Sequence, residues 1–330
     1  MRAKNISPLR VNNKNLREFA PFALFAFKKM NPTLLVLLGP TGVGKTNISI
    51  RLAEHFSAPI ISSDSRQFYR ELKIGTAAPT ERELAKIRHY FIGSHSIFDK
   101  YNCGQFELDV LHLLEELFAK HETVMLVGGS MMYIDAVCSG IDDVPTIDCE
   151  TRNFWLAQYA EKGAEFIQAE LKRLDPEHYE RVDLNNHKRV LHALEICSII
   201  GRPYSDIRTG KVKERPFNII KIGLTREREE LYERINARVD EMMADGLLEE
   251  ATQFYEYRHL NTLNTVGYKE LYEYMSGNAT LEEAVELIKR DSRRYAKRQL
   301  SWFKRDKEIK WFHPDSEDEI INYIECTKAQ

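Results

Sequence analysis

A glycine-rich octapeptide constrains the fold of this 330-residue chain more than any other feature. It reads Gly39-Pro-Thr-Gly-Val-Gly-Lys45-Thr46 and fits the pattern G-x-x-x-x-G-K-[ST]. The aliphatic run 34–38 directly before it is typical of a fully buried strand, and residues 46–56 after it are typical of a helix. A strand, a glycine-rich loop and a helix in this order predict a binding site for a di- or triphosphate.

Each residue type in this loop has a physical role in phosphate binding. Glycine lets the backbone curve so that successive N–H groups point at phosphate oxygens, and the start of the helix adds a partial positive charge. The ammonium group of Lys45 adds a mobile charge, and the hydroxyl of Thr46 is placed to bind Mg²⁺ as the metal ligand. The predicted diphosphate-binding residues are Gly39, Pro40, Thr41, Gly42, Val43, Gly44, Lys45 and Thr46.

Strand-like and helical segments alternate beyond this loop. Further strands are predicted at 59–63, 123–127 and 217–224, and a helix is predicted at 106–120. This alternation predicts an α/β fold built on a parallel sheet.

The same pattern predicts how the chain divides into domains. Residues 31–140 and 209–330 are expected to form a P-loop NTPase-like core with a largely helical C-terminal part, and residues 141–208 a helical insertion domain. Residues 1–30 are interpreted as a poorly ordered N-terminal extension, or as sequence before a natural start at Met30. A secretory signal is an open alternative, because the apolar run 19–27 has basic residues on both sides.

The composition excludes several classes of protein. With 47 basic and 50 acidic residues, the net charge of −3 excludes a disordered polyelectrolyte and a histone-like cation, but it argues neither for nor against nucleic-acid binding. Five scattered cysteines without a C-x-x-C pair argue against a disulfide framework or a structural zinc site. No apolar run approaches the roughly 20 residues of a membrane span. We therefore expect a cytoplasmic protein without a membrane partner.

An acidic residue follows the predicted strand at 59–63. Asp64 and the phosphate loop both follow strands, so we expect them to line one crevice, where the carboxylate can accept a proton from a nucleophile. The alternative is a helix N-cap, a position that favours aspartate. The strand at 123–127 ends in Gly128-Gly129-Ser130 without the acid usual in motor ATPases and GTPases, which favours group transfer over hydrolysis.

The segment 289–310 is basic and contains interleaved aromatic residues. Its basic side chains recur at helical spacing and form a stripe at Arg290, Arg294, Lys297 and Arg298. Such a stripe can follow phosphates, and Tyr295, Trp302 and Phe303 can stack on splayed RNA bases. The alternative is a solvated helix face whose aromatic residues pack on the core.

Eight short segments, taken in order, carry a family resemblance. They are GPTGVGKT (39–46), DSRQFY (64–69), LKIGTAAPT (72–80), VGGSMMY (127–133), KRVLHALEI (188–196), RINARVDEM (234–242), TVGYKE (265–270) and YAKRQLSWFKR (295–305). This ordered set resembles the tRNA dimethylallyltransferases, and the similarity extends from about residue 33 to 312. No Cys/His cluster follows residue 313, where some eukaryotic relatives carry a zinc finger, so the chain is similar to the bacterial form.

The resemblance implies an alkyl transfer. Dimethylallyl diphosphate would occupy the phosphate loop with Mg²⁺, and the N6 amine of adenosine 37 in the tRNA anticodon stem-loop would attack the allylic carbon and release diphosphate. Three residues match the family's catalytic positions: Asp64 as general base, Arg238 as the arginine that stabilises the departing diphosphate, and Thr41 as the loop threonine near the reacting centre. We also expect the protein to be a monomer.

Matching positions imply tRNA contacts in several parts of the chain. These are Asp64, Ser65, Arg66, Gln67, Ser130, Arg152, Lys188, Arg189, Val190, Leu191, His192, Thr265, Val266, Gly267, Tyr268, Lys269, Glu270, Lys297, Arg298 and Gln299. The sequence departs from the family pattern at Met131 and Met132 in the Gly-Gly turn, at Ala78, where lysine is common, and at His192, where arginine is usual. These departures affect the RNA contacts more than the chemistry.

Three other functions stay open on the sequence. A small-molecule kinase with ATP in the loop explains the loop and Asp64 but gives the basic helix and the insertion no role. An adenylate isopentenyltransferase, which prenylates free nucleotides, has no need of the RNA signatures. A nucleotide-gated RNA-binding module without enzymatic activity has no need of Asp64.

Overall fold

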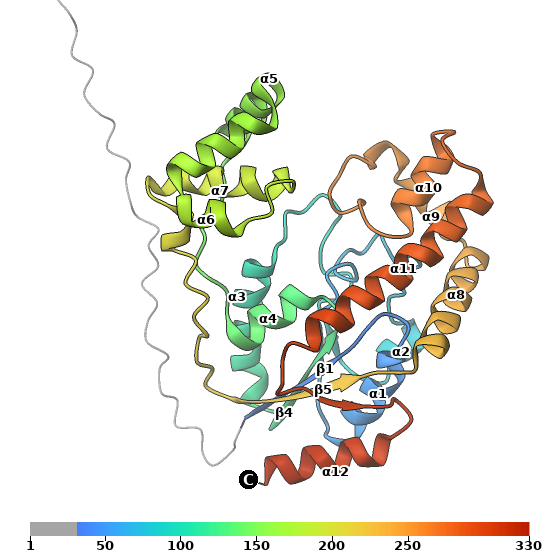
Figure 1. Ribbon diagram of the computed structural model, residues 1–330. Coiled ribbons are helices and arrows are strands. Elements are labelled where there is room, and N and C mark those ends of the chain that lie inside the picture. Colours follow the sequence, from blue (N-terminus) through green and yellow to red (C-terminus); the bar gives the residue numbers. More distant parts are fainter. Residues whose placement is uncertain (1–31, 330) are drawn as a thin grey trace, which may run out of the picture.

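A six-stranded sheet forms the centre of the molecule, for which we use a computed structural model that describes residues 32–329 (Figure 1). The strand order is β3-β2-β4-β1-β5-β6, and every neighbouring pair is parallel. The predicted parallel α/β core is therefore confirmed. The three interpretations of residues 1–30 lie outside the described residues.

The strands differ widely in length, which influenced which of them could be predicted from the sequence. They are β1 (Thr33–Leu38), β2 (Ile60–Ser62), β3 (His89–Tyr90), β4 (Thr123–Gly128), β5 (Asn218–Leu224) and β6 (Lys310–Phe312). The four predicted strands correspond to β1, β2, β4 and β5. The edge strands β3 and β6 have only two and three residues, too few for a hydrophobic period to be recognised.

Helices cover both faces of the sheet, and the side chains of β1 alternate between them. Leu34, Val36 and Leu38 pack in one cluster with α3 (Cys103–Phe118) and α4 (Met131–Ser139). Leu35 and Leu37 pack in another with α1 (Lys45–His55), α8 (Arg228–Ala244) and α12 (Glu317–Lys328). Burial on both sides explains why β1 is aliphatic at every position after Thr33.

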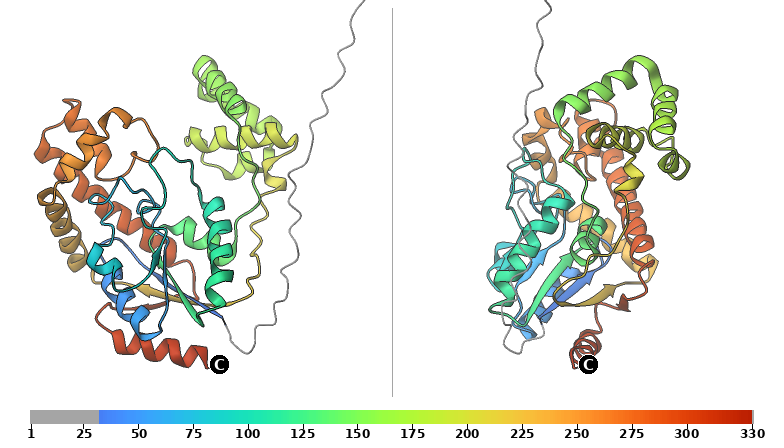
Figure 2. Two further views of the ribbon diagram at one scale, coloured as in Figure 1. Left: turned by 180° about the vertical axis from the view of Figure 1, so that it is seen from behind. Right: turned by 90° about the vertical axis from the view of Figure 1, so that its left-hand side faces the viewer.

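The helical segment between α4 and β5 has a hydrophobic cluster of its own, which includes Trp155, Leu171 and Leu194. It contains α5 (Cys149–Leu174), α6 (Pro176–Arg181), α7 (His187–Ile200) and the 3₁₀ turn η1 (Tyr204–Asp206). Helix α5 is broken at Gly163, whose φ of 79° is left-handed. Figures 1 and 2 show this lobe on the side of the sheet opposite α12.

A third cluster joins the C-terminal helices to the segment after β2, because it contains Tyr69 and Leu72 together with Tyr268 and Leu271. Its helices are α9 (Leu247–Gln253), α10 (Tyr268–Met275) and α11 (Leu281–Phe303), with the 3₁₀ turn η2 (Tyr255–Tyr257) between α9 and α10. The short α2 (Glu81–Leu84) precedes β3. None of the helices in the described part of the chain is both long enough and apolar enough to span a membrane.

Candidate active site at the phosphate loop

The phosphate loop turns sharply between β1 and α1, and glycine is required at its tightest points. Gly42 has a φ of 78°, and a Cβ there would lie 2.7 Å from Cγ1 of Ile235 in α8. A Cβ on Gly39 would lie 2.8 Å from the carbonyl oxygen of Leu224. The loop is thus pressed against α8 and β5, with no room for larger residues.

Lys45 starts α1 and bends back over the loop. Its Nζ donates hydrogen bonds to the carbonyl oxygens of Gly39 and Pro40, at 3.0 and 2.8 Å. The pKa of Lys45 is lowered to about 8, mainly by burial. Among the nearby charges, Asp64 opposes this decrease and Arg238 adds to it. These effects place Lys45, Asp64 and Arg238 within electrostatic reach of one another.

Two arginines of α8 reach the loop from the side. Nη1 of Arg238 lies 3.4 Å from Oγ1 of Thr41, and Nε of Arg234 donates to the carbonyl oxygen of Gly42 at 3.0 Å. Burial lowers the pKa of Arg238, and Asp64 opposes that effect. The three predicted catalytic residues, Asp64, Arg238 and Thr41, therefore come together at one end of the sheet.

Asp64 lies in a tight turn directly after β2. Its Oδ1 accepts a hydrogen bond from the backbone N–H of Arg66 at 3.0 Å, which caps this turn. The next helix along the described chain is α2 at Glu81, so the alternative of a helix N-cap is wrong. Burial raises the pKa of Tyr295 in α11 to about 12, and Asp64 adds to this rise, so a phenol also lies near the carboxylate.

The turn after β4 packs beside Asp64. The Ser130 hydroxyl accepts from the backbone N–H of Ser65 at 2.8 Å and donates to the Ser65 hydroxyl at 3.0 Å. Strand β4 is a direct neighbour of β1, and it ends at Gly128, which Gly129 follows. The strand beside the phosphate loop thus carries no acid at its end, as the sequence indicated.

Gln299 of α11 bridges the phosphate loop and the β4 turn, a role that the sequence did not reveal. Its Oε1 accepts from the backbone N–H of Thr41 at 2.9 Å, and its Nε2 donates to the carbonyl oxygen of Gly129 at 2.8 Å. The side chain is 2% exposed. Gln299 was predicted to contact tRNA, but both ends of its amide form hydrogen bonds to the protein backbone.

The predicted tRNA-contacting residues fall into three groups by exposure. Exposed are Arg152, Lys188, Arg189, His192, Lys297 and Arg298. Partly buried are Asp64, Ser65, Arg66, Gln67, Thr265, Val266 and Lys269. Buried are Ser130, Val190, Leu191, Gly267, Tyr268, Glu270 and Gln299. A buried side chain has no surface to offer RNA, so the third group supports neighbouring residues in this conformation.

The aromatic residues of the basic helix pack inward. Phe303 is 2% exposed in the core, and Nε1 of Trp302 donates to Oδ2 of Asp135 in α4 at 2.8 Å. The guanidinium carbon of Arg305 lies 3.7 Å from the centre of the Trp302 ring. The prediction that Trp302 and Phe303 stack on RNA bases is therefore wrong, and the alternative of packing on the core is confirmed for them.

Residues 32–329 contain no cluster of three or more His, Cys, Asp or Glu side chains suited to a metal ion. Thr46, in the first turn of α1, is partly buried beside the loop. Mg²⁺ commonly binds one or two protein oxygens and completes its shell with substrate phosphates and water. The residues present are compatible with a divalent cation held mainly by phosphate, for which the Thr46 hydroxyl would be the protein ligand.

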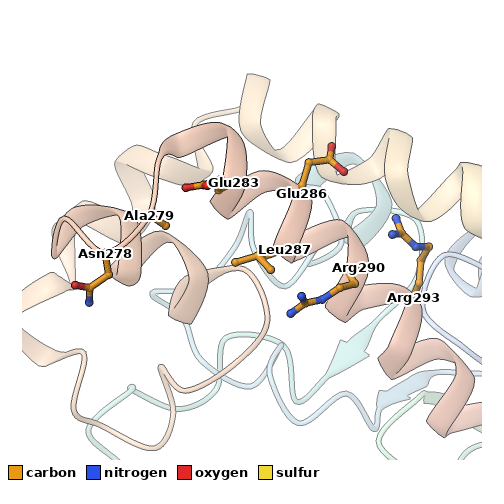
Figure 3. Close-up of a pocket in the computed structure, with 7 residues that line it drawn as sticks. All are labelled: Asn278, Ala279, Glu283, Glu286, Leu287, Arg290 and Arg293. Atoms are coloured by element: carbon orange, nitrogen blue, oxygen red, sulfur yellow. The ribbon is translucent and has the colours of Figure 1, made fainter.

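A surface cavity of about 570 Å³ lies along α11 and the turn before it (Figure 3). Its lining contains no phosphate-loop residue and consists of Asn278, Ala279, Glu283, Glu286, Leu287, Arg290 and Arg293. Two carboxylates and two guanidinium groups balance one another there, which gives the cavity no net attraction for an anion. The candidate active site is therefore at the phosphate loop.

Comparison with known proteins gives a consistent result. Residues 67–306 match a family model described as IPP transferase. tRNA dimethylallyltransferase 1 of Phocaeicola vulgatus is 60% identical over 295 residues, which cover 89% of this chain and 98% of that protein. tRNA dimethylallyltransferase 1 of Bacteroides fragilis is 57% identical with the same coverage.

Solved structures agree with these sequence matches. The full-length tRNA isopentenylpyrophosphate transferase of Bacillus halodurans is 36% identical and superposes with a TM-score of 0.68, covering 90% of this chain and 97% of that one. A eukaryotic dimethylallyltransferase described as acting on tRNA is 26% identical, with a TM-score of 0.69 and coverage of 82% and 70%.

Proposed function

The chain belongs to the IPP transferase family, and we propose that it transfers a dimethylallyl group from dimethylallyl diphosphate to N6 of adenosine 37 in the tRNA anticodon loop. Family membership confirms the resemblance found in the sequence. The observation that carries the proposal is the convergence of Lys45, Arg238 and Asp64 at the phosphate loop. Two cations and one carboxylate in one site suit a reaction that releases an anion and a proton together.

The cations act on the leaving group in this proposal. As the bond between C1 and the diphosphate oxygen breaks, its electron pair goes to the diphosphate, and positive charge develops on the allylic carbon. Lys45, Arg238 and the N–H groups of the loop are placed to stabilise the new anion. Arg238 also lies against Thr41, which we propose faces the reacting carbon.

Asp64 acts on the nucleophile. The N6 amine is part of an aromatic system and is a weak nucleophile, so removing its proton during attack assists the formation of the N6–C1 bond. The carboxylate accepts that proton, and the hydrogen bond from the N–H of Arg66 fixes its orientation beforehand. We propose that Thr46 would hold a Mg²⁺ ion, which would help to neutralise the negative charge of the diphosphate.

The RNA surface comprises two regions in this proposal. Lys297 and Arg298 are exposed on α11, next to Gln299, which contacts the loop. Lys188 and Arg189 are exposed at the start of α7 in the helical lobe. We propose that residues 141–208 are an insertion domain, that both regions bind the anticodon stem-loop, and that the protein is a cytoplasmic monomer.

The test is product analysis with labelled dimethylallyl diphosphate, Mg²⁺ and either tRNA or AMP. We expect the label in tRNA at adenosine 37 and none in AMP. Label in AMP would indicate an adenylate isopentenyltransferase, and phosphate transfer from ATP would indicate a kinase. In Asp64→Ala we expect kcat to fall by about 10²- to 10⁴-fold while diphosphate binding persists. Turnover near the wild-type rate in that variant would contradict the role of Asp64.

A further inference from the structure

A buried carboxylate lies between the C-terminal helices and the segment that follows Asp64. Glu250 of α9 is 8% exposed. Its Oε2 accepts from the backbone N–H groups of Lys73 and Ile74, at 2.8 and 2.9 Å. Its Oε1 accepts from the N–H of Gly75 at 3.0 Å and from the hydroxyl of Tyr268 at 2.6 Å. All four donors are neutral, so the charge is stabilised by hydrogen bonds from groups in fixed positions.

Tyr268 closes this arrangement from the other side. Its side chain is fully buried, and a Cβ on Gly75 would lie 2.6 Å from its ring. The phenol therefore packs directly on the backbone that Glu250 binds. Lys73, Ile74 and Gly75 are fixed by residues about 175 to 195 positions later in the chain, which no local turn can replace.

The fixed segment continues directly to Gln67. Nε2 of Gln67 donates to the carbonyl oxygens of Thr76 and Ala77, at 3.3 and 3.1 Å. Thr76 is itself tied back, since its hydroxyl donates to the carbonyl oxygen of Leu72 at 2.6 Å. The position of the Gln67 side chain is thus set by the residues that follow Gly75.

Gln67 in turn contacts the backbone of Asp64 from two sides. Its own N–H donates to the carbonyl oxygen of Asp64 at 3.2 Å. Its Oε1 accepts from the Ser62 hydroxyl at 3.2 Å, and the Ser62 oxygen accepts from the N–H of Asp64 at 3.3 Å. A continuous path of hydrogen bonds and short backbone links therefore joins Glu250 to Asp64.

We infer that Glu250 is a positioning residue that sets the geometry of Asp64 through residues 73–77 and Gln67. The inference rests on the proposed role of Asp64 as the base. Proton transfer depends on the placement of the base, and a shift of about 1 Å can cost about 10²-fold in rate. Glu250→Gln keeps the shape of the side chain but turns one acceptor into an NH₂ group that faces N–H donors. We expect residues 73–77 to shift in response, and Asp64 to shift with them.

The test is a double-mutant cycle on single-turnover rates, with dimethylallyl diphosphate and a tRNA transcript. We expect Glu250→Gln to lower the rate by about 10- to 100-fold in the wild-type background. In the Asp64→Ala background we expect less than about a twofold further loss, because there is no base left to misplace. The affinity for inorganic diphosphate is expected to stay within about twofold, since the path from Glu250 ends at Asp64, whereas Lys45 is held by the carbonyl oxygens of the phosphate loop itself.

Two further variants make the result decisive. Tyr268→Phe removes one of the four donors to Glu250, so it should lower the single-turnover rate less than Glu250→Gln does, and only when Asp64 is present. This variant tests the inference even if Glu250→Gln does not fold. Glu71→Gln is the matched control. Glu71 also accepts hydrogen bonds, from the N–H of Ile97 at 3.1 Å and from the Ser96 hydroxyl at 2.7 Å, but none joins it to Gln67. We expect the wild-type rate from this control.

The outcomes separate this inference from the proposed function. If Glu250→Gln and Tyr268→Phe slow the reaction equally with and without Asp64, or do not slow it at all, Glu250 does not act through Asp64 and the inference is overturned. If Asp64→Ala itself retains the wild-type rate, the proposed role of Asp64 fails first.

Discussion

A buried ion pair fixes the chain where it returns from the helical lobe to the sheet. Arg215, just before β5, pairs with Glu107 of α3 at 2.7 Å, and their side chains are 8% and 5% exposed. Arg215 also donates to the carbonyl oxygens of Val137 and Ala136, at 2.9 and 2.7 Å. Glu107 accepts in addition from the N–H of Ile141, where the chain leaves the core. The Glu107 carboxylate thus contacts both segments that connect the lobe to the core, at Ile141 and at Arg215.

Arg215→Met tests how much this pair contributes. The methionine retains an aliphatic stem but leaves the Glu107 carboxylate buried without its cation. Breaking a buried pair in this way typically costs about 3–5 kcal/mol. The Nζ of Lys213, 3.7 Å from Glu107, and the N–H of Ile141 still stabilise the charge. We therefore expect the lower end, about 3 kcal/mol, which at about 2 °C per kcal/mol lowers Tm by about 6 °C.

The assay is urea unfolding followed by circular dichroism, with Tm measured in parallel. The matched variant is the double mutant Glu107→Gln/Arg215→Met, which removes both charges and keeps an oxygen for Ile141. We expect it to recover about 2 kcal/mol of the loss, because the cost comes from the unpaired charge. A single mutant within about 0.5 kcal/mol of the wild type, or a double mutant less stable than the single, would refute this reasoning.

Two further predictions concern the helical lobe and the basic stripe. Burial raises the pKa of Asp175, but hydrogen bonds from the N–H of His178 and from the N–H and hydroxyl of Ser205 outweigh this and leave the pKa lowered. Because the pKa of Asp175 is lower in the folded protein than the value of about 3.9 in the unfolded chain, its ionised carboxylate stabilises the fold above about pH 3.9. This stabilisation is lost as the pH falls from about 3.9 through the folded pKa. Acid titration by circular dichroism should therefore show an acid-induced loss of stability that is weaker in Asp175→Asn, and equal slopes in the two proteins would contradict this. Lys297→Glu/Arg298→Glu should raise the KM for tRNA at least about tenfold, leave diphosphate affinity unchanged, and reduce the slope of log Kd against log salt by about 1.4, at about 0.7 per phosphate contact. An unchanged slope would exclude these side chains from the RNA surface.

The sequence predicted the elements whose signals are local. The run at 34–38 is aliphatic because both faces of β1 are covered, and the glycines beside it are needed where the loop meets α8 and β5. β6 depends on pairing with β5 over three residues, so its signal lies in the partner and not in its own sequence. Helix α12 lies in the C-terminal part that was predicted to be largely helical, but its bounds were not predicted.

The sequence also could not predict the bridging roles of Gln299 and Glu250, because their partners lie far away in the chain. Gln299 and Thr41 are 258 positions apart, and Glu250 and Gly75 are 175 apart. A polar residue in a helical pattern is normally expected at the surface, and only the fold shows which of them meets an orphan backbone group. The family segments therefore combine exposed residues that are predicted to contact RNA, such as Arg298, with buried residues that pack inside the protein, such as Tyr268.

The site combines two groups of residues that depend mainly on different parts of the chain. Lys45 and Arg238 depend on the phosphate loop and α8, whereas Asp64 depends on Gln67 and residues 73–77, which are fixed by α9 and α10. Helix α10 starts at Tyr268, within the predicted RNA-contacting segment 265–270. RNA that displaced this segment would act more directly on the base than on the residues of the phosphate loop. In this arrangement the alkyl donor could bind before the base is correctly placed. A base that is placed correctly only when tRNA docks would protect the allylic diphosphate from water in the absence of tRNA.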